Sequence, residues 1–104
     1  MNTIERHPGF ENIYLHYKFT KEFKSMFGKS VPVQYTNWLH RRLLMLEKEG
    51  KQAVDGVSFE KLKGKEGDAG LYSIRYAKSK ANPRVIYAYI GEDGECALLS
   101  AFLE

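Results

Sequence analysis

The feature that most constrains the fold is the stretch 59–103, which contains three short runs rich in β-branched and aromatic residues. These runs cover 71–77, 84–90 and 95–103. Clusters of Gly, Pro, Asn and Asp separate them, and runs of this composition between turn residues are typical of β-strands. Because consecutive strands joined by short turns pair antiparallel, the stretch predicts a three-stranded antiparallel meander.

The N-terminal half predicts one more strand and two helices. Apolar and polar residues alternate over 12–19, as in a strand. Thr20 can cap a short helix that Gly28 ends. Apolar residues repeat with a period of about 3.6 over 33–49, which predicts a longer helix, and Gly50 follows where helices commonly stop.

Length and segment order together predict the fold class. The chain has 104 residues, of which 43% are hydrophobic and 28% charged, so we expect a single globular domain spanning 1–104. The order of the segments predicts an α+β fold, in which an antiparallel sheet of about four strands carries two N-terminal helices on one face. Residues 1–11 show no period and are expected to form a loose lead-in.

The composition favours a cytoplasmic protein. No apolar run approaches the roughly 20 residues of a membrane helix, and the first residues lack the apolar segment of a secretory signal. The single cysteine, Cys96, has no partner for an internal disulfide, which is typical of a reducing compartment. We therefore expect a cytoplasmic location and no membrane partner.

Cationic residues gather around the first predicted hairpin. If the tyrosine-rich faces of the strands pack against the helices, then Arg75 and Arg84 share the opposite, open face, because directly paired residues point the same way. The turn before this hairpin adds three lysines, Lys61, Lys63 and Lys65. The sequence thus predicts a cationic cluster on a rigid sheet, although a net charge of +3 is equally typical of a solvated basic surface.

The histidines predict neither a metal site nor a nucleophile pair. His7, His16 and His40 lie far apart in the sequence, without the spacing of metal ligands. No Gly-rich phosphate loop lies between a strand and a helix. We therefore expect no metal and no small-molecule cofactor. His16 could act as a general base if its strand reaches the open face, and Tyr14 or Tyr87 could stack on a base if exposed.

Four short segments, in a fixed order, resemble a known family. They are Lys61-Leu62-Lys63-Gly64, Gly70-Leu71-Tyr72-Ser73-Ile74-Arg75, Pro83-Arg84-Val85-Ile86-Tyr87 and Leu98-Leu99-Ser100-Ala101-Phe102. This run resembles the RelE/ParE superfamily of toxins from type II toxin–antitoxin systems, especially the phage-derived HigB-like branch. The resemblance covers the C-terminal half of the chain.

The resemblance implies a RelE-like, microbial-RNase-like fold and an activity. RelE and HigB toxins are ribosome-dependent mRNA endonucleases, or mRNA interferases, which cleave RNA without metal by attack of the 2′-hydroxyl. The implied partners are a cognate antitoxin protein, mRNA and the ribosome. Past the position of Phe102 the family usually continues with basic residues and sometimes a catalytic tyrosine or histidine, whereas this sequence continues only to Glu104. No general acid is therefore assigned.

The resemblance also implies which residues carry the chemistry. Arg84 matches the arginine that contacts the scissile phosphate, Arg75 matches a second basic position, and Ser73 stands where RelE has a lysine. A guanidinium stays protonated and can stabilise the developing phosphorane charge, while Lys63 could act as base if its pKa were lowered. The predicted catalytic residues are Arg84, Arg75 and Lys63. The predicted RNA-binding residues are Lys61, Lys65, Ser73, Lys78 and Lys80.

Two other functions fit the same residues. ParE-like chains of this superfamily inhibit DNA gyrase and do not cleave RNA. A relative without catalysis would bind nucleic acid and show steep salt dependence. The sequence leaves these alternatives open beside the endoribonuclease.

Overall fold

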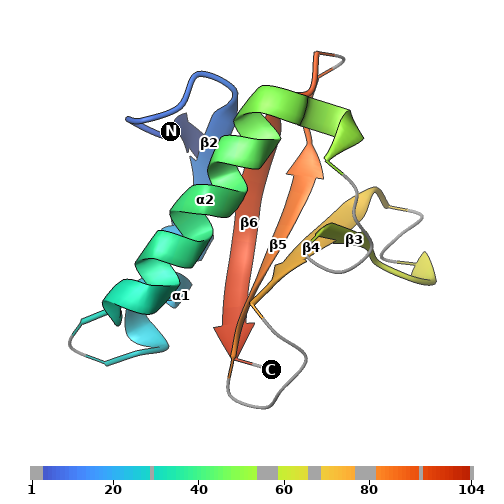
Figure 1. The fold of residues 1–104 in the computed structure, drawn as a ribbon. Helices are drawn as coiled ribbons and strands as arrows, with labels where there is room; N and C mark the ends of the chain where they lie inside the picture. Colours follow the sequence, from blue (N-terminus) through green and yellow to red (C-terminus); the bar gives the residue numbers. More distant parts are fainter. Residues whose placement is uncertain are drawn as a thin grey trace.

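The computed structural model describes residues 4–28, 30–53, 59–65, 69–76, 82–91 and 93–103. Within these ranges one sheet has its strands in the order β1-β2-β6-β5-β4-β3, and α2 lies across one of its faces (Figure 1). The elements are β1 (Ile4–Arg6), β2 (Ile13–His16), α1 (Tyr17–Ser25), α2 (Val33–Glu49), the 3-10 turn η1 (Gly50–Gln52), β3 (Phe59–Lys61), β4 (Leu71–Arg75), β5 (Pro83–Tyr89) and β6 (Cys96–Leu103).

The sheet differs from the predicted one in the number and direction of its strands. Over the described residues it has six strands, and β2 runs parallel to β6 with Ile13 opposite Cys96. The prediction of about four antiparallel strands with two N-terminal helices on one face is therefore wrong. The added strands, β1 and β3, lie at the two edges with three residues each, which is too short to show the alternation by which strands are recognised.

The C-terminal meander of the sheet is confirmed. Strands β4, β5 and β6 pair antiparallel, with Ile74 opposite Val85 and Val85 opposite Ala101. These side chains are buried and belong to the hydrophobic core together with Tyr87 and Leu98. The core therefore lies against the face of the sheet that α2 covers.

Helix α2 has the bounds that its periodicity predicts. Gly50 ends it with a φ of 58°, a left-handed conformation that glycine adopts readily. Its buried side chains enter the core: Leu39, Leu43 and Leu46 are four and three residues apart, and Trp38 precedes Leu39. This stripe attaches α2 to the sheet and leaves its charged side in solvent.

Helix α1 begins earlier than the sequence predicts, at Tyr17. The side chain of His16 accepts a hydrogen bond from the Lys18 backbone N–H over 3.0 Å and caps the helix, which satisfies one of the N–H groups left over at a helix start. The helix then runs beside the C-terminal half of β6 (Figure 1). There Glu22 Oε1 accepts a hydrogen bond from the Ala101 N–H over 3.3 Å, so α1 covers the edge of β6 that β2 does not reach.

A β-bulge in β6 changes which side chains face away from α2. Ser100 lies opposite Ile86, whereas Leu98 lies opposite the next residue of β5, so Leu99 is an extra residue. Because side chains alternate along a strand, one extra residue moves all later side chains to the other face. Ser100 and Phe102 therefore point away from the helices.

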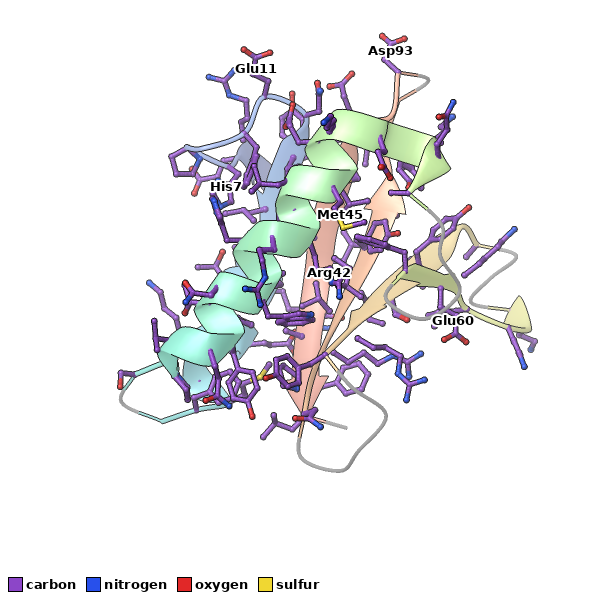
Figure 2. All side chains as sticks on the ribbon, viewed as in Figure 1. His7, Glu11, Arg42, Met45, Glu60 and Asp93 are labelled. Carbon is purple, nitrogen blue, oxygen red and sulfur yellow. The ribbon has the colours of Figure 1, made fainter. Side chains whose placement is uncertain are left out.

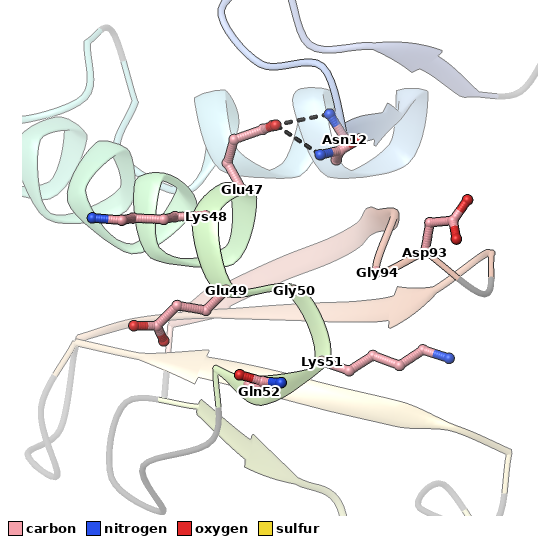
Figure 3. Close-up of a pocket in the computed structure, with 9 residues that line it drawn as sticks. All are labelled: Asn12, Glu47, Lys48, Glu49, Gly50, Lys51, Gln52, Asp93 and Gly94. Atoms are coloured by element: carbon pink, nitrogen blue, oxygen red, sulfur yellow. Dashed lines mark hydrogen bonds between the residues drawn. The ribbon is translucent and has the colours of Figure 1, made fainter.

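The C-terminal end of α2 contacts the β5–β6 hairpin through two glycines. A Cβ atom added to Gly94 would lie 3.1 Å from the Gly50 Cα. The Gly50 carbonyl accepts a hydrogen bond from the Tyr89 hydroxyl over 3.0 Å. Nearby, Asn12 donates to the Glu47 carboxylate from its side chain over 2.8 Å and from its backbone over 2.9 Å (Figure 3). These contacts hold the end of α2 against the sheet.

Candidate nucleic-acid interface

The face of the sheet opposite α2 carries both predicted arginines. The strand register pairs Arg75 with Arg84 across β4 and β5, and Arg84 with Phe102 across β5 and β6. Directly paired residues point the same way, so these three side chains form one row. Within the described residues no helix packs on this side of the sheet (Figure 1). We call it the open face.

The guanidinium of Arg84 is oriented by a buried hydroxyl. Arg84 Nη2 donates a hydrogen bond to Ser73 Oγ over 3.2 Å, and Ser73 has no exposed surface. An enclosed hydroxyl moves little and therefore holds one edge of the guanidinium in a defined direction. Ser73, predicted as an RNA-binding residue, lies too deep to contact RNA. It positions Arg84 instead.

Arg75 shares the open face with a carboxylate that the sequence did not single out. Arg75 Nη1 lies 3.7 Å from Glu60 Oε2, and Glu60 lies on the edge strand β3 (Figure 2). Both side chains are partly exposed, so solvent screens this ion pair. The position of Glu60 could have been inferred from its neighbour Phe59, which is buried. Side chains alternate along a strand, so the residue after a buried one lies on the opposite face. That inference needs β3 to be recognised as a strand.

Beside Arg84 the open face forms a hollow of about 300 Å³. Apart from Arg84 and one serine, its lining is apolar: Leu62, Leu71, Arg84, Ile86, Ser100 and Phe102. The volume is at the lower end of the range for small-ligand pockets. The open face is therefore less basic than the sequence predicts, with an arginine placed at an apolar depression.

The predicted lysines lie outside this hollow. Lys61 lies opposite Tyr72 on β4, whose ring stacks on Tyr87 on the α2 side of the sheet, so Lys61 points to that side. Lys63, a predicted catalytic residue, and Lys65 are exposed in the turn after β3. Two further predicted RNA-binding residues lie outside the described residues, Lys78 and Lys80.

The other candidate side chains are also separate from the hollow. His16 lies on β2 and caps α1. Cys96 is fully buried, and burial followed by the nearby Glu47 raises the pKa of its thiol to about 12, so it is no nucleophile at neutral pH. Tyr87 is fully buried and cannot stack on a base. Tyr14 is half-buried on β2, with β6 between it and β5.

A second hollow, of about 400 Å³, lies at the C-terminal end of α2 (Figure 3). Its lining mixes both signs of charge, including Lys48, Lys51 and Asp93. The Glu47 carboxylate in it already accepts two hydrogen bonds from Asn12. Among the described residues, no three His, Cys, Asp or Glu side chains are placed to hold a metal ion. The contacts of this hollow join α2 to the sheet.

Comparison with protein-family models, curated proteins and solved structures finds no match for this chain. The resemblance to RelE/ParE toxins therefore stays a prediction from the residues. Neither helix in the described part of the chain is long and apolar enough to cross a membrane. Chemically, the open face offers an oriented guanidinium beside an apolar hollow, which suits an anion joined to an apolar group.

Proposed function

We propose that the chain is an RNA-binding toxin that inhibits translation by cleaving mRNA on the ribosome. The observation that carries this proposal is the Arg75–Arg84 pair on the open face, with the Arg84 guanidinium oriented by Ser73. Guanidinium groups bind phosphate oxygens in a bidentate geometry. The resemblance of the segment around Arg84 to the family segment that contacts the scissile phosphate supports the same role here.

The proposed reaction assigns separate roles to these side chains. The 2′-oxygen of the RNA forms a bond to phosphorus as the bond to the 5′-oxygen breaks; the 5′-oxygen leaves with the electron pair and takes a proton from water, and a 2′,3′-cyclic phosphate remains. Arg84 stabilises the developing negative charge, assisted by Arg75. We assign the general-base role to Glu60, which lies 3.7 Å from Arg75 and would accept the proton of the 2′-hydroxyl. Lys63 and Lys65 bind the phosphates of flanking nucleotides.

A second candidate function is RNA binding without cleavage. Two observations favour it. No histidine, lysine or carboxylate is among the described residues that line the hollow, and the Glu60 carboxylate already pairs with Arg75. In that case the open face holds RNA through phosphate contacts alone, and the chain inhibits by occupying its target.

Induced expression with primer extension on translated mRNA separates the two functions. Arg84→Ala should lower cleavage about a hundredfold or more, as the loss of one oriented stabiliser typically does. Arg84→Lys should restore little, because an ammonium does not reproduce the bidentate fork. Arg41→Ala is the matched control, since Arg41 is exposed on α2 away from the open face, and it should leave cleavage and growth inhibition unchanged.

Thermal unfolding of each variant accompanies this assay. Arg84→Ala removes the hydrogen bond to the buried Ser73 hydroxyl, so we expect the free energy of unfolding to fall by about 1 kcal/mol. A folded Arg84→Ala protein that cuts mRNA as the wild type does would contradict the role given to Arg84. A wild type that binds RNA and cuts none would establish the second function in place of the first.

A further inference from the structure

The bulge in β6 supplies the open face with side chains that a regular strand would place in the core. With Leu99 inserted, Phe102 lies opposite Arg84, and Ser100 lies opposite Ile86. Bulges often redirect side chains next to binding sites. An aromatic ring and a hydroxyl therefore stand beside the oriented guanidinium.

The hollow on the open face has a charged end and an apolar end. Arg84 and Phe102 pair in one row across the sheet, and Ile86, two residues along β5, also lines the hollow. Leu71 and Leu62 close the far end, joined by a hydrogen bond from the Leu62 N–H to the Leu71 carbonyl over 3.0 Å. A ligand that matches this surface carries an anion at one end and a flat, largely apolar group at the other.

We propose that this hollow binds one nucleobase of the RNA, with Phe102 against the base and Arg84 on the adjoining phosphate. The inference rests on the proposed RNA-binding function and adds the part of the nucleotide that the arginines do not contact. Phe102 is 42% exposed, so its ring is accessible for stacking, which stabilises single-stranded RNA on many proteins. The Ser100 hydroxyl can donate to or accept from the edge of the base.

The charge of Arg84 in the lining of the hollow favours a nucleotide over a purely apolar ligand. The lining combines the Arg84 guanidinium with apolar side chains, so a purely apolar occupant would match the apolar end and leave the charged end unmatched. A nucleotide satisfies both ends at once, because its phosphate binds the guanidinium while its base covers Ile86 and Leu71. The geometry therefore favours a nucleotide over a second copy of the chain.

Methyl-labelled protein and three small probes test the site by NMR. The probes are a nucleoside monophosphate, ribose phosphate, which lacks the base, and the nucleoside, which lacks the phosphate. We expect the nucleotide to shift the methyl signals of Ile86 and Leu71 together with the Arg84 side-chain N–H signal. Ribose phosphate should shift the Arg84 signal only. The methyl signals of Leu44, exposed on α2, should not move.

One variant and its matched control give the size of the effect. Phe102→Ala should weaken binding of the nucleotide about tenfold, as loss of one stacking partner does. It should leave the affinity for ribose phosphate unchanged. Leu44→Ala removes an apolar side chain of similar exposure, 48% against 42%, and should change neither affinity.

The outcomes separate this site from the proposed function. If the nucleotide and ribose phosphate bind with equal affinity and the Ile86 and Leu71 methyl signals do not move, the base site is wrong and only phosphate binding remains. If no probe moves these signals, but the Arg84→Ala substitution abolishes RNA binding, the base site is also wrong while the proposed RNA binding stands. A protein that binds no RNA at all would overturn both. Methyl shifts that follow protein concentration alone would assign the hollow to a second copy and overturn the base site.

Discussion

Arg75 and Arg84 are the same residue type in the same row of the sheet, yet their surroundings give them different roles. Fixing a long side chain costs up to about 2 kcal/mol of conformational free energy. Ser73 Oγ fixes the direction of the Arg84 guanidinium before any ligand arrives. Arg75 instead lies 3.7 Å from Glu60, a carboxylate that competes with phosphate for it. Under the proposed function, we therefore expect Arg84 to contribute more to phosphate binding than Arg75 does.

The ion pair between Arg75 and Glu60 predicts that Glu60→Gln changes RNA affinity and cleavage in opposite directions. Because the substitution removes the carboxylate beside Arg75, RNA binding should tighten by about twofold to threefold, as expected for a weak exposed ion pair. If Glu60 is the general base, cleavage should fall by about a hundredfold or more. Fluorescence anisotropy with a short RNA and cleavage assays on the same preparation measure the two effects. Glu49→Gln, at an exposed carboxylate of α2, is the matched control. Equal cleavage by Glu60→Gln and wild type would remove Glu60 from the reaction.

At the scale of the elements, local signals decide what the sequence predicts. Helix α2 and the β4–β5–β6 meander follow from periodicity and short turns, and Arg75 and Arg84 are brought together by the alternation within that meander. The parallel pairing of β2 with β6 joins Ile13 to Cys96 near opposite ends of the chain. No local pattern records such a pairing, because the packing of the whole core selects it.

The hollow on the open face could not be predicted from the sequence either, because it also depends on how the strands pair. Its aromatic wall depends on the extra residue Leu99, and the run around Leu99 reads as an ordinary apolar strand. Likewise, Glu60 belongs to a three-residue strand that shows no alternation of its own. Both features depend on which strand lies next to which, and this register becomes visible only in three dimensions.

The junction between α2 and the β5–β6 hairpin predicts a sharp sensitivity at Gly94. Its φ is 88°, and an added Cβ would lie 3.1 Å from the Gly50 Cα. Gly94→Ala should therefore cost about 3 kcal/mol, from backbone strain together with overpacking. Gly28→Ala is the control, because Gly28 has a φ of 77° with no atom within 4 Å of the added Cβ. It should cost only the backbone strain, about 1 kcal/mol. Urea unfolding measures both, and equal losses would show that the glycine contact is not tight.

At the scale of the whole molecule, net charge alone does not locate the proposed RNA-binding surface. The sequence carries a net charge of +3, but cations lie on both sides of the sheet. Helix α1 exposes Lys18 and Lys21, and α2 exposes Arg41 and Lys48. All of these attract an anionic polymer at long range. The open face differs from the helical layer in geometry, since Arg84 is oriented there beside a hollow.

Salt titration of RNA binding tests this difference between the two faces. For single-stranded RNA, each phosphate contact contributes about 0.7 to the slope of log K against log salt. Arg84→Ala should therefore lower that slope by about 0.7. Lys21→Ala removes one charge from α1, and its slope should match the wild type, because the proposed interface on the open face gives Lys21 no phosphate contact. Anisotropy between about 50 and 200 mM salt covers the informative range. If Lys21→Ala lowers the slope as much as Arg84→Ala does, RNA binds across the helices. The arginines of the open face would then be part of an ordinary solvated surface.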